Sequence, residues 1–127
     1  MPQGNGQSFY TSALANHTQE LSPMLSKSIL EFIDKDEQIE TAARALKSIA
    51  HPLRLKILCV IGENEVCVHE IVDAVGTSQS NVSQHLAIMR DKEILASRKE
   101  ANRVYYRVSD PRTLQLVVLM RELFCSR

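Results

Sequence analysis

Residues 68–92, VHEIVDAVGTSQSNVSQHLAIMRDK, contain two helical patterns separated by a short turn. We expect the first helix from about Val68 to Val75, where Gly76 is a natural left-handed stop. The second helix is expected from Gln79 to about Lys92, capped by the threonine or serine before it. Two helices joined by a glycine-containing turn of about four residues form the helix-turn-helix signature. This stretch therefore predicts a DNA-binding motif.

The outward face of the second helix carries small, uncharged polar side chains. At about 100° per residue, Val82, Leu86 and Met89 fall on the core side, whereas Ser80, Gln84 and Ala87 point the opposite way. Glutamine and asparagine pair with adenine in the major groove, and serine is permissive. A merely solvated helix face is the alternative interpretation. The predicted DNA-contacting residues of this helix are Gln79, Ser80, Ser83, Gln84 and His85.

After this helix the pattern changes from helical to alternating. Ile94–Lys99 and Val104–Val108 are expected as two strands, joined by a turn in which Asn102 suits a positive φ. Between residues 77 and 107, six side chains are positive and three are negative. A basic ribbon can reach phosphates or the minor groove, although a charged edge also prevents aggregation. The predicted DNA contacts of this hairpin are Arg98, Lys99, Asn102, Arg103 and Tyr105.

The rest of the chain predicts one domain with a polar tail. Residues 1–22 are expected to be a mobile polar tail, and residues 23–127 a single DNA-binding and dimerisation domain. The helix at Leu53–Ile61 is apolar around nearly its whole circumference, so we expect it to be buried. The last helix, after Pro111, is too apolar to be left in water, which predicts a partner subunit. The expected fold is mainly α with a β-hairpin wing, a homodimeric winged helix-turn-helix.

Composition excludes several classes of protein. The chain has 127 residues and a formal net charge of zero, with no apolar run long enough for a membrane span and no secretory signal, so we expect a cytosolic protein. Three cysteines argue against a disulfide framework. The sequence shows neither a nucleophile with an assigned base nor a phosphate loop, so we expect no enzyme and no cofactor. A protein-binding module without DNA function remains the alternative from another class.

Three linked motifs resemble the ArsR/SmtB family of repressors. Residues 45–58 (ALKSIAHPLRLKIL) resemble the opening of that family's core, residues 78–86 (SQSNVSQHL) its recognition helix, and residues 98–106 (RKEANRVYY) its wing. The resemblance implies a homodimer formed through the first and last helices of the family core. It also implies double-stranded operator DNA as the partner, and a repressor that an inducer releases from DNA.

Two cysteines resemble those of the thiol-switch branch of this family, the SqrR, BigR and HlyU type. The segments that carry the resemblance are Leu58-Cys59 and Leu123-Phe124-Cys125. It implies that Cys59 and Cys125 of one subunit become joined by a disulfide or polysulfide bridge, and that the inducer is a reactive sulfur species or an oxidant. From the residues alone, both cysteines could equally be small hydrophobic side chains of a core, with Cys59 buried.

A third cysteine gives a weaker, metal-based alternative. Residues 65–71 (EVCVHEI) resemble the metal-binding segment of the arsenic and cadmium branches, with His69 in place of the second cysteine. Cysteine and histidine both bind soft or borderline metals, but Cys67 and His69 alone are not a site and would need further ligands such as His17. A metal-ion-responsive repressor thus remains an alternative. The last helix contains no histidine, so the family's zinc site there is not expected.

Overall fold

A computed structural model describes residues 36–125 of the chain. The described residues from Ala43 onward belong to one compact unit, which begins within the first described helix. The predicted polar tail, residues 1–22, lies outside the described residues. The described elements are α2 (Asp36–Ile49), α3 (Pro52–Ile61), β1 (Val66–Cys67), α4 (Val68–Val75), α5 (Gln79–Asp91), β2 (Leu95–Glu100), β3 (Arg103–Val108) and α6 (Arg112–Phe124).

Local side-chain and backbone geometry sets the ends of the central helices. The Nδ1 atom of His51 accepts the backbone N–H of Leu53 at 3.1 Å, and Pro52 fills the first turn of α3. Helix α4 ends at Gly76, which adopts a left-handed φ of 78°. Helix α5 begins after Ser78, whose hydroxyl accepts the backbone N–H of Asn81 at 3.1 Å. The helix-turn-helix predicted from the sequence is confirmed.

The strands form a small antiparallel sheet with the order β1-β3-β2. Strands β2 and β3 make the predicted hairpin, and Glu100 pairs with Arg103 across its two-residue turn. We call this hairpin the wing. The positive φ in the turn falls on Ala101, at 56°, and not on Asn102, so that expectation was wrong. The pairing register makes Ala101 the first turn position, and a type II′ hairpin turn takes its positive φ there.

One strand was not expected from the sequence. Strand β1 has two residues, and Val66 pairs with Tyr106 of β3. So short a segment carries no alternating pattern of its own, because a period of two needs more than two residues to be recognised. Its pairing joins the chain immediately before α4 to the wing.

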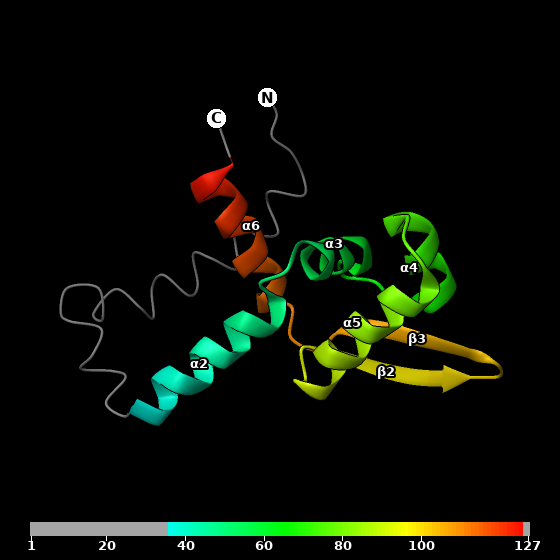
Figure 1. Cartoon of the computed structure of the whole chain (residues 1–127), viewed down its shortest axis with the longest axis horizontal. Coiled ribbons are helices and arrows are strands. Elements are labelled where there is room, and N and C mark those ends of the chain that lie inside the picture. The colour runs from blue at the N-terminus through cyan, green and yellow to red at the C-terminus, as the bar shows by residue number, and fades with distance from the viewer. Residues whose placement is uncertain (1–35, 126–127) are drawn as a thin grey trace. The chain divides into compact units, whose positions relative to one another are not determined.

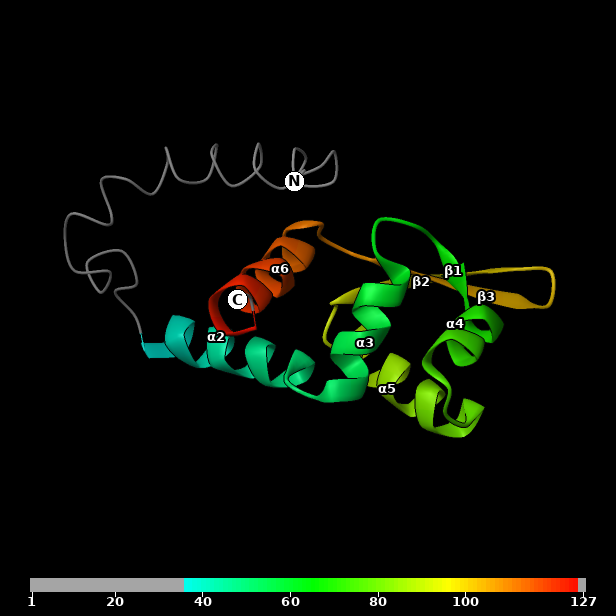
Figure 2. The same cartoon turned by 90° about the horizontal axis from the view of Figure 1, so that it is seen from above.

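The core lies where α3, α4, α5 and the sheet meet. Figures 1 and 2 show the wing projecting from this helix cluster, with α6 on the side away from the wing tip. None of the helices in residues 36–125 has the length and apolar character that crossing a membrane requires. The largest fully buried side chains are Ile57, Leu58, Ile61, Ile71, Val82, Leu86, Met89 and Leu95.

Helix α3 is less enclosed than its composition predicted. Ile57, Leu58 and Ile61 are fully buried, but Leu55 and Cys59 are exposed. The expectation that this helix is buried all round, with Cys59 inside the core, was therefore wrong. The core of a small single chain covers one side of α3 and leaves another side open, although both sides are apolar.

Candidate nucleic-acid interface

Helix α5 presents the polar face that the sequence predicted. Val82, Leu86 and Met89 are buried on its inner side, whereas Ser80 and Gln84 are exposed. The flanking Gln79 and Ser83 are also exposed, and Ala87 is half-buried. The exposed face is uncharged and carries both hydrogen-bond donors and acceptors. Such a face can approach base edges without an electrostatic preference for one particular base.

His85 connects α5 to α3. The Nε atom of Arg54 donates a hydrogen bond to Nδ1 of His85 at 3.0 Å, and the rings of His51 and His85 lie 4.4 Å apart. Arg54 also donates to the backbone carbonyl of Ser48 at 3.1 Å. Partial burial lowers the pKa of His85, and the nearby His51 and Arg54 lower it further. His85, expected from the sequence to be near DNA, therefore holds the position of α5 as a neutral acceptor.

One basic side chain of the wing, Arg98, is engaged in ion pairs, whereas other polar and basic side chains of the wing are exposed. Arg98 donates to Glu65 at 2.8 Å and also to Glu100, and its guanidinium carbon lies 4.8 Å from the ring centroid of Tyr105. These bonds raise the pKa of Arg98, and the hydrogen bond from Arg98 lowers the pKa of Glu65. Arg98 thus ties the wing to the loop before β1, and its guanidinium lies over the ring of Tyr105. Lys99, Asn102 and Arg103 are exposed.

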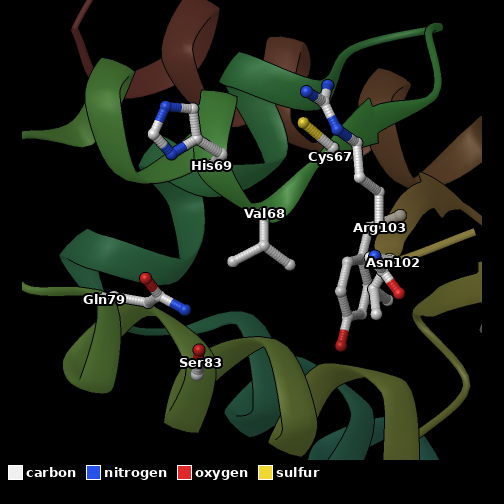
Figure 3. Close-up of a pocket in the computed structure, with 9 residues that line it drawn as sticks. Cys67, Val68, His69, Gln79, Ser83, Asn102 and Arg103 are labelled. Atoms are coloured by element: carbon white, nitrogen blue, oxygen red, sulfur yellow. The ribbon is translucent and has the colours of Figure 1, made fainter.

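A groove of about 590 Å³ lies between α5 and the wing. Figure 3 shows Gln79 and Ser83 on one side of it and Asn102 and Arg103 on the other, with Val68 between them. No aspartate or glutamate is among the residues that form its wall. The sequence had predicted four of these residues as DNA contacts but had not brought them into one hollow. The full lining is Cys67, Val68, His69, Gln79, Ser83, Asn102, Arg103, Val104 and Tyr106.

Tyr106 is the polar lining residue that sequence analysis did not single out as functional. It is buried, with 7% of its surface exposed. It is itself an inward-facing residue of β3, on the same face of the strand as Val104 and Val108. The sequence did contain one signal, because the alternating pattern of the strand assigns Tyr106 to the core although its phenol carries a polar hydroxyl. Without the strand register, that signal cannot be connected to α5.

The three cysteines occupy two different environments. Cys59 on α3 and Cys125 at the C-terminal cap of α6 are both exposed as free thiols, and α3 packs against α6. Cys67 is also free but only 2% exposed, and its thiol donates to a carboxylate oxygen of Glu70 at 3.4 Å. In the single chain the first two thiols are therefore exposed, whereas the third is enclosed.

The metal candidates have no third ligand within the part of the chain that the structure describes. His69 is exposed, and its Nε2 lies 3.5 Å from a carboxylate oxygen of Asp73. Among residues 36–125 there is no group of three or more histidine, cysteine, aspartate or glutamate side chains that could hold an ion. His17 lies outside the described residues.

Comparison with known proteins gives consistent matches. Residues 51–97 match the family model described as "Bacterial regulatory protein, arsR family". The transcriptional activator HlyU of Vibrio cholerae is 33% identical over 104 residues, covering 82% of this chain and 96% of that protein. The biofilm growth-associated repressor of Xylella fastidiosa is 30% identical over 94 residues, covering 74% of this chain and 82% of that protein.

Solved structures of two such proteins share the fold. HlyU from Vibrio cholerae aligns with a TM-score of 0.65 at 35% identity, covering 72% of this chain and 99% of that chain. The transcriptional repressor BigR from Xylella fastidiosa aligns with a TM-score of 0.66 at 30% identity, covering 74% of this chain and 96% of that chain. The order of elements, the polar face of α5 and these alignments agree, and the chain belongs to the ArsR family of bacterial winged helix-turn-helix transcriptional regulators.

Proposed function

We propose that the protein is a repressor that binds operator DNA as a homodimer and releases it when Cys59 and Cys125 are oxidised. The single observation that carries the DNA-binding part is the exposed, uncharged polar face of α5, backed by a fully buried opposite face. In this arrangement Ser80 and Gln84 read base edges in the major groove, and the free basic and polar groups of the wing contact the DNA backbone.

Binding of DNA is tested by titrating a labelled duplex at several salt concentrations. A phosphate-contacting dimer should show a steep fall of affinity with salt, because each neutralised phosphate releases counterions. The duplex is selected from a random library, with a shuffled version as the non-specific control. A flat salt response with both duplexes would overturn the DNA-binding proposal and favour the protein-binding module.

Base reading is assigned to Gln84 in particular. Gln84→Ala should cost about 1–3 kcal/mol on the selected duplex and little on the shuffled one, because a lost base contact matters only where that base is present. Equal losses on both duplexes would show that Gln84 only positions the protein on the backbone. Exposed on the same helix, Arg90 offers a control, since Arg90→Gln should weaken both complexes equally.

The dimer is supported by the apolar side chains that α6 leaves exposed. Phe124 is 73% exposed and Leu123 is 64% exposed in the single chain, and Leu119 and Met120 are exposed on the same helix. Large apolar side chains that cluster on one surface indicate an interaction site. We propose that a second copy of the same chain covers this surface of α6. A protein with two recognition helices matches a duplex that presents two half-sites.

The thiol switch is supported by the positions of the two exposed cysteines. Cys59 and Cys125 sit on α3 and at the end of α6, two helices that contact each other. Joining them removes two hydrogen atoms from the pair of thiols. A peroxide accepts them and becomes water, or a persulfide donor accepts them and becomes a thiol and hydrogen sulfide. The new covalent link fixes α6 relative to α3 and so changes how two subunits present their α5 helices.

Mass spectrometry after exposure to each reagent tests the switch. A persulfide donor or a peroxide should join Cys59 to Cys125 within one subunit and weaken DNA binding. Cys59→Ser and Cys125→Ser should each abolish the response, while Cys67→Ser, the matched control, should leave it intact. If only Cys67 is modified, or if DNA binding of the Cys59→Ser variant still responds, the switch proposal fails. A response to a metal ion that Cys67→Ser removes would favour the metal alternative.

A further inference from the structure

We propose that the groove between α5 and the wing seats one phosphodiester group of the DNA backbone in each subunit, with the hydroxyl of the buried Tyr106 as one of its donors. This inference rests on the proposed function and deepens it. It divides the exposed polar residues into two groups, base readers at Ser80 and Gln84 and a phosphate seat built from α5 and the wing. It also adds Tyr106, which sequence analysis did not include.

Tyr106 is the observation that points to a ligand. Its side chain is more than nine-tenths buried, and it belongs to the wall of the groove. Its hydroxyl makes no hydrogen bond with any residue between 36 and 125. A buried polar atom without a partner costs about 1–3 kcal/mol, so such atoms normally receive a partner from protein, water or a ligand. In this groove, an acceptor arriving from outside would satisfy the hydroxyl.

Four further polar side chains of the wall can donate hydrogen bonds and have no partner within the described residues. Within the described part of the chain, the side chains of Gln79, Ser83, Asn102 and Arg103 take part in no hydrogen bond or ion pair with another residue. The wall contains no carboxylate, although two glutamates neutralise Arg98 on the same hairpin. Arginine, amide and hydroxyl donors facing one hollow with a net positive charge match an anion with several acceptor oxygens.

The position of the groove selects the phosphate of a duplex as that anion. Gln79 and Ser83 on the groove wall alternate along α5 with Ser80 and Gln84 on the reading face. The phosphates of a duplex border the major groove, which is about 12 Å wide. A helix that places Ser80 and Gln84 against base edges therefore brings a bordering backbone alongside Gln79, Ser83 and the tip of the wing. Backbone contacts of this kind fix register and orientation.

Removal of a single hydroxyl tests the seat. Tyr106→Phe should weaken binding to the selected and the shuffled duplex by the same factor, about 10-fold for each seat, because a hydrogen bond to a charged group is lost on any sequence. The slope of affinity against salt should stay unchanged, since a hydroxyl carries no charge. Ser97→Ala is the matched control. It also deletes one hydroxyl, at the β2 position paired with Tyr106 but outside the groove wall, and should bind like the wild type.

Charge removal is the second arm of the test. Arg103→Gln should weaken both complexes and lower the salt slope by about 1 for each subunit. Arg112→Gln makes the same change in net charge at the start of α6, away from the groove, and should leave the slope unaltered. Thermal unfolding of each variant establishes that its fold is intact before the affinities are compared.

Neutral phosphates locate the contact on the DNA. Methylphosphonate groups are placed one at a time along the selected duplex. A methylphosphonate at one position in each half-site should lower the affinity of the wild-type protein. The same methylphosphonate should have a much smaller effect on the affinity of Tyr106→Phe or Arg103→Gln, because the change in the DNA and the change in the protein remove the same interaction. A competition experiment asks whether a free anion occupies the seat instead. Inorganic phosphate is compared with chloride at constant ionic strength, and a free anion in the seat would compete with DNA only in the wild type.

The outcomes separate the two levels of the proposal. Wild-type protein that shows no salt-dependent binding to any duplex overturns the proposed function. Wild-type protein that binds normally, with Tyr106→Phe indistinguishable from Ser97→Ala, overturns the phosphate seat and leaves the proposed function standing. Loss of affinity in Tyr106→Phe on the selected duplex alone would also overturn the seat, because that pattern indicates base reading at Tyr106.

Discussion

Ala101 adopts a backbone conformation that favours glycine. Its φ of 56° lies in the left-handed region, which costs a residue with a Cβ roughly 1 kcal/mol or more relative to glycine. Ala101→Gly should therefore raise the free energy of unfolding by about 0.5–1 kcal/mol. Urea unfolding with an unchanged m-value measures this. Asn102→Gly is the control, because φ at 102 is not positive and glycine there should give no gain. Equal stabilisation by both variants would contradict the explanation.

His85 should make stability dependent on pH. Burial lowers its pKa in the folded protein below the ordinary value of 6.5, with His51 and Arg54 adding to the effect. As pH falls below about 6.5, the unfolded chain takes up this proton before the folded protein does, so the free energy of unfolding decreases until pH passes the lowered folded-state pKa. His85→Gln keeps an acceptor for Arg54 and should flatten this slope between pH 7.5 and 5.

A second histidine provides the comparison for that experiment. His69 is exposed on α4 and lies near Asp73, away from the His51–His85 pair. His69→Gln should therefore retain the wild-type dependence of unfolding free energy on pH. If His69→Gln flattens the slope and His85→Gln does not, the acid sensitivity arises elsewhere and the account of His85 is wrong.

The functional residues could be predicted from the sequence only where local pattern determines exposure. Ser80 and Gln84 were predicted correctly to face outward because the helix period alone separates them from Val82 and Leu86. The ion pair of Arg98 with Glu65 could not be anticipated, because Glu65 lies 33 residues away and reaches it only through the fold. Cys59 was wrongly predicted to lie inside the core, because an apolar residue in a sequence does not show whether its own chain or another chain buries it.

At the scale of elements, the N-terminal cap of α5 should control both stability and DNA binding. The Ser78 hydroxyl accepts the N–H of Asn81 and orders the first turn, which carries Gln79 and Ser80. Ser78→Ala should lower the free energy of unfolding by about 1 kcal/mol, and Ser78→Asp should restore most of it. Urea unfolding measures the stability, and duplex titration should show weaker binding for the alanine variant. Full stability in Ser78→Ala would contradict the role of the cap.

The helices and the hairpin were predictable because each has a start or stop signal in its own residues. Gly62, Gly76 and Ser78 mark ends within one residue of where the structure has them. Strand β1 was missed because its two residues pair only through contacts with β3, about 40 residues further along the chain. The groove was missed for a related reason, since its wall combines α4, α5 and β3.

At the scale of the whole molecule, the exposed side of α6 should determine the oligomeric state. Leu123→Glu places a charge among apolar side chains that we propose pack against a second copy, and should convert the dimer to a monomer. Affinity for a two-half-site duplex should then fall by about 100-fold or more, because the two reading helices are no longer linked. Sedimentation velocity measures the first effect, and duplex titration the second.

A charge added elsewhere controls for that experiment. Asn64→Glu adds the same charge at an exposed position between α3 and β1, outside α6. This variant should remain a dimer. If Leu123→Glu also sediments as a dimer, the surface of α6 is not the contact between subunits.

The pairing of β1 with β3 limits which movements can regulate this protein. Val66 pairs with Tyr106 of the wing and lies two residues before α4, so this pairing links the hairpin to the helix-turn-helix within one chain. We expect the proposed switch to leave the position of the hairpin on the helix-turn-helix unchanged. We therefore expect the inducer of the proposed dimer to weaken DNA binding by altering the distance or angle between the two subunits, so that the regulated quantity is inter-subunit spacing measured in base pairs.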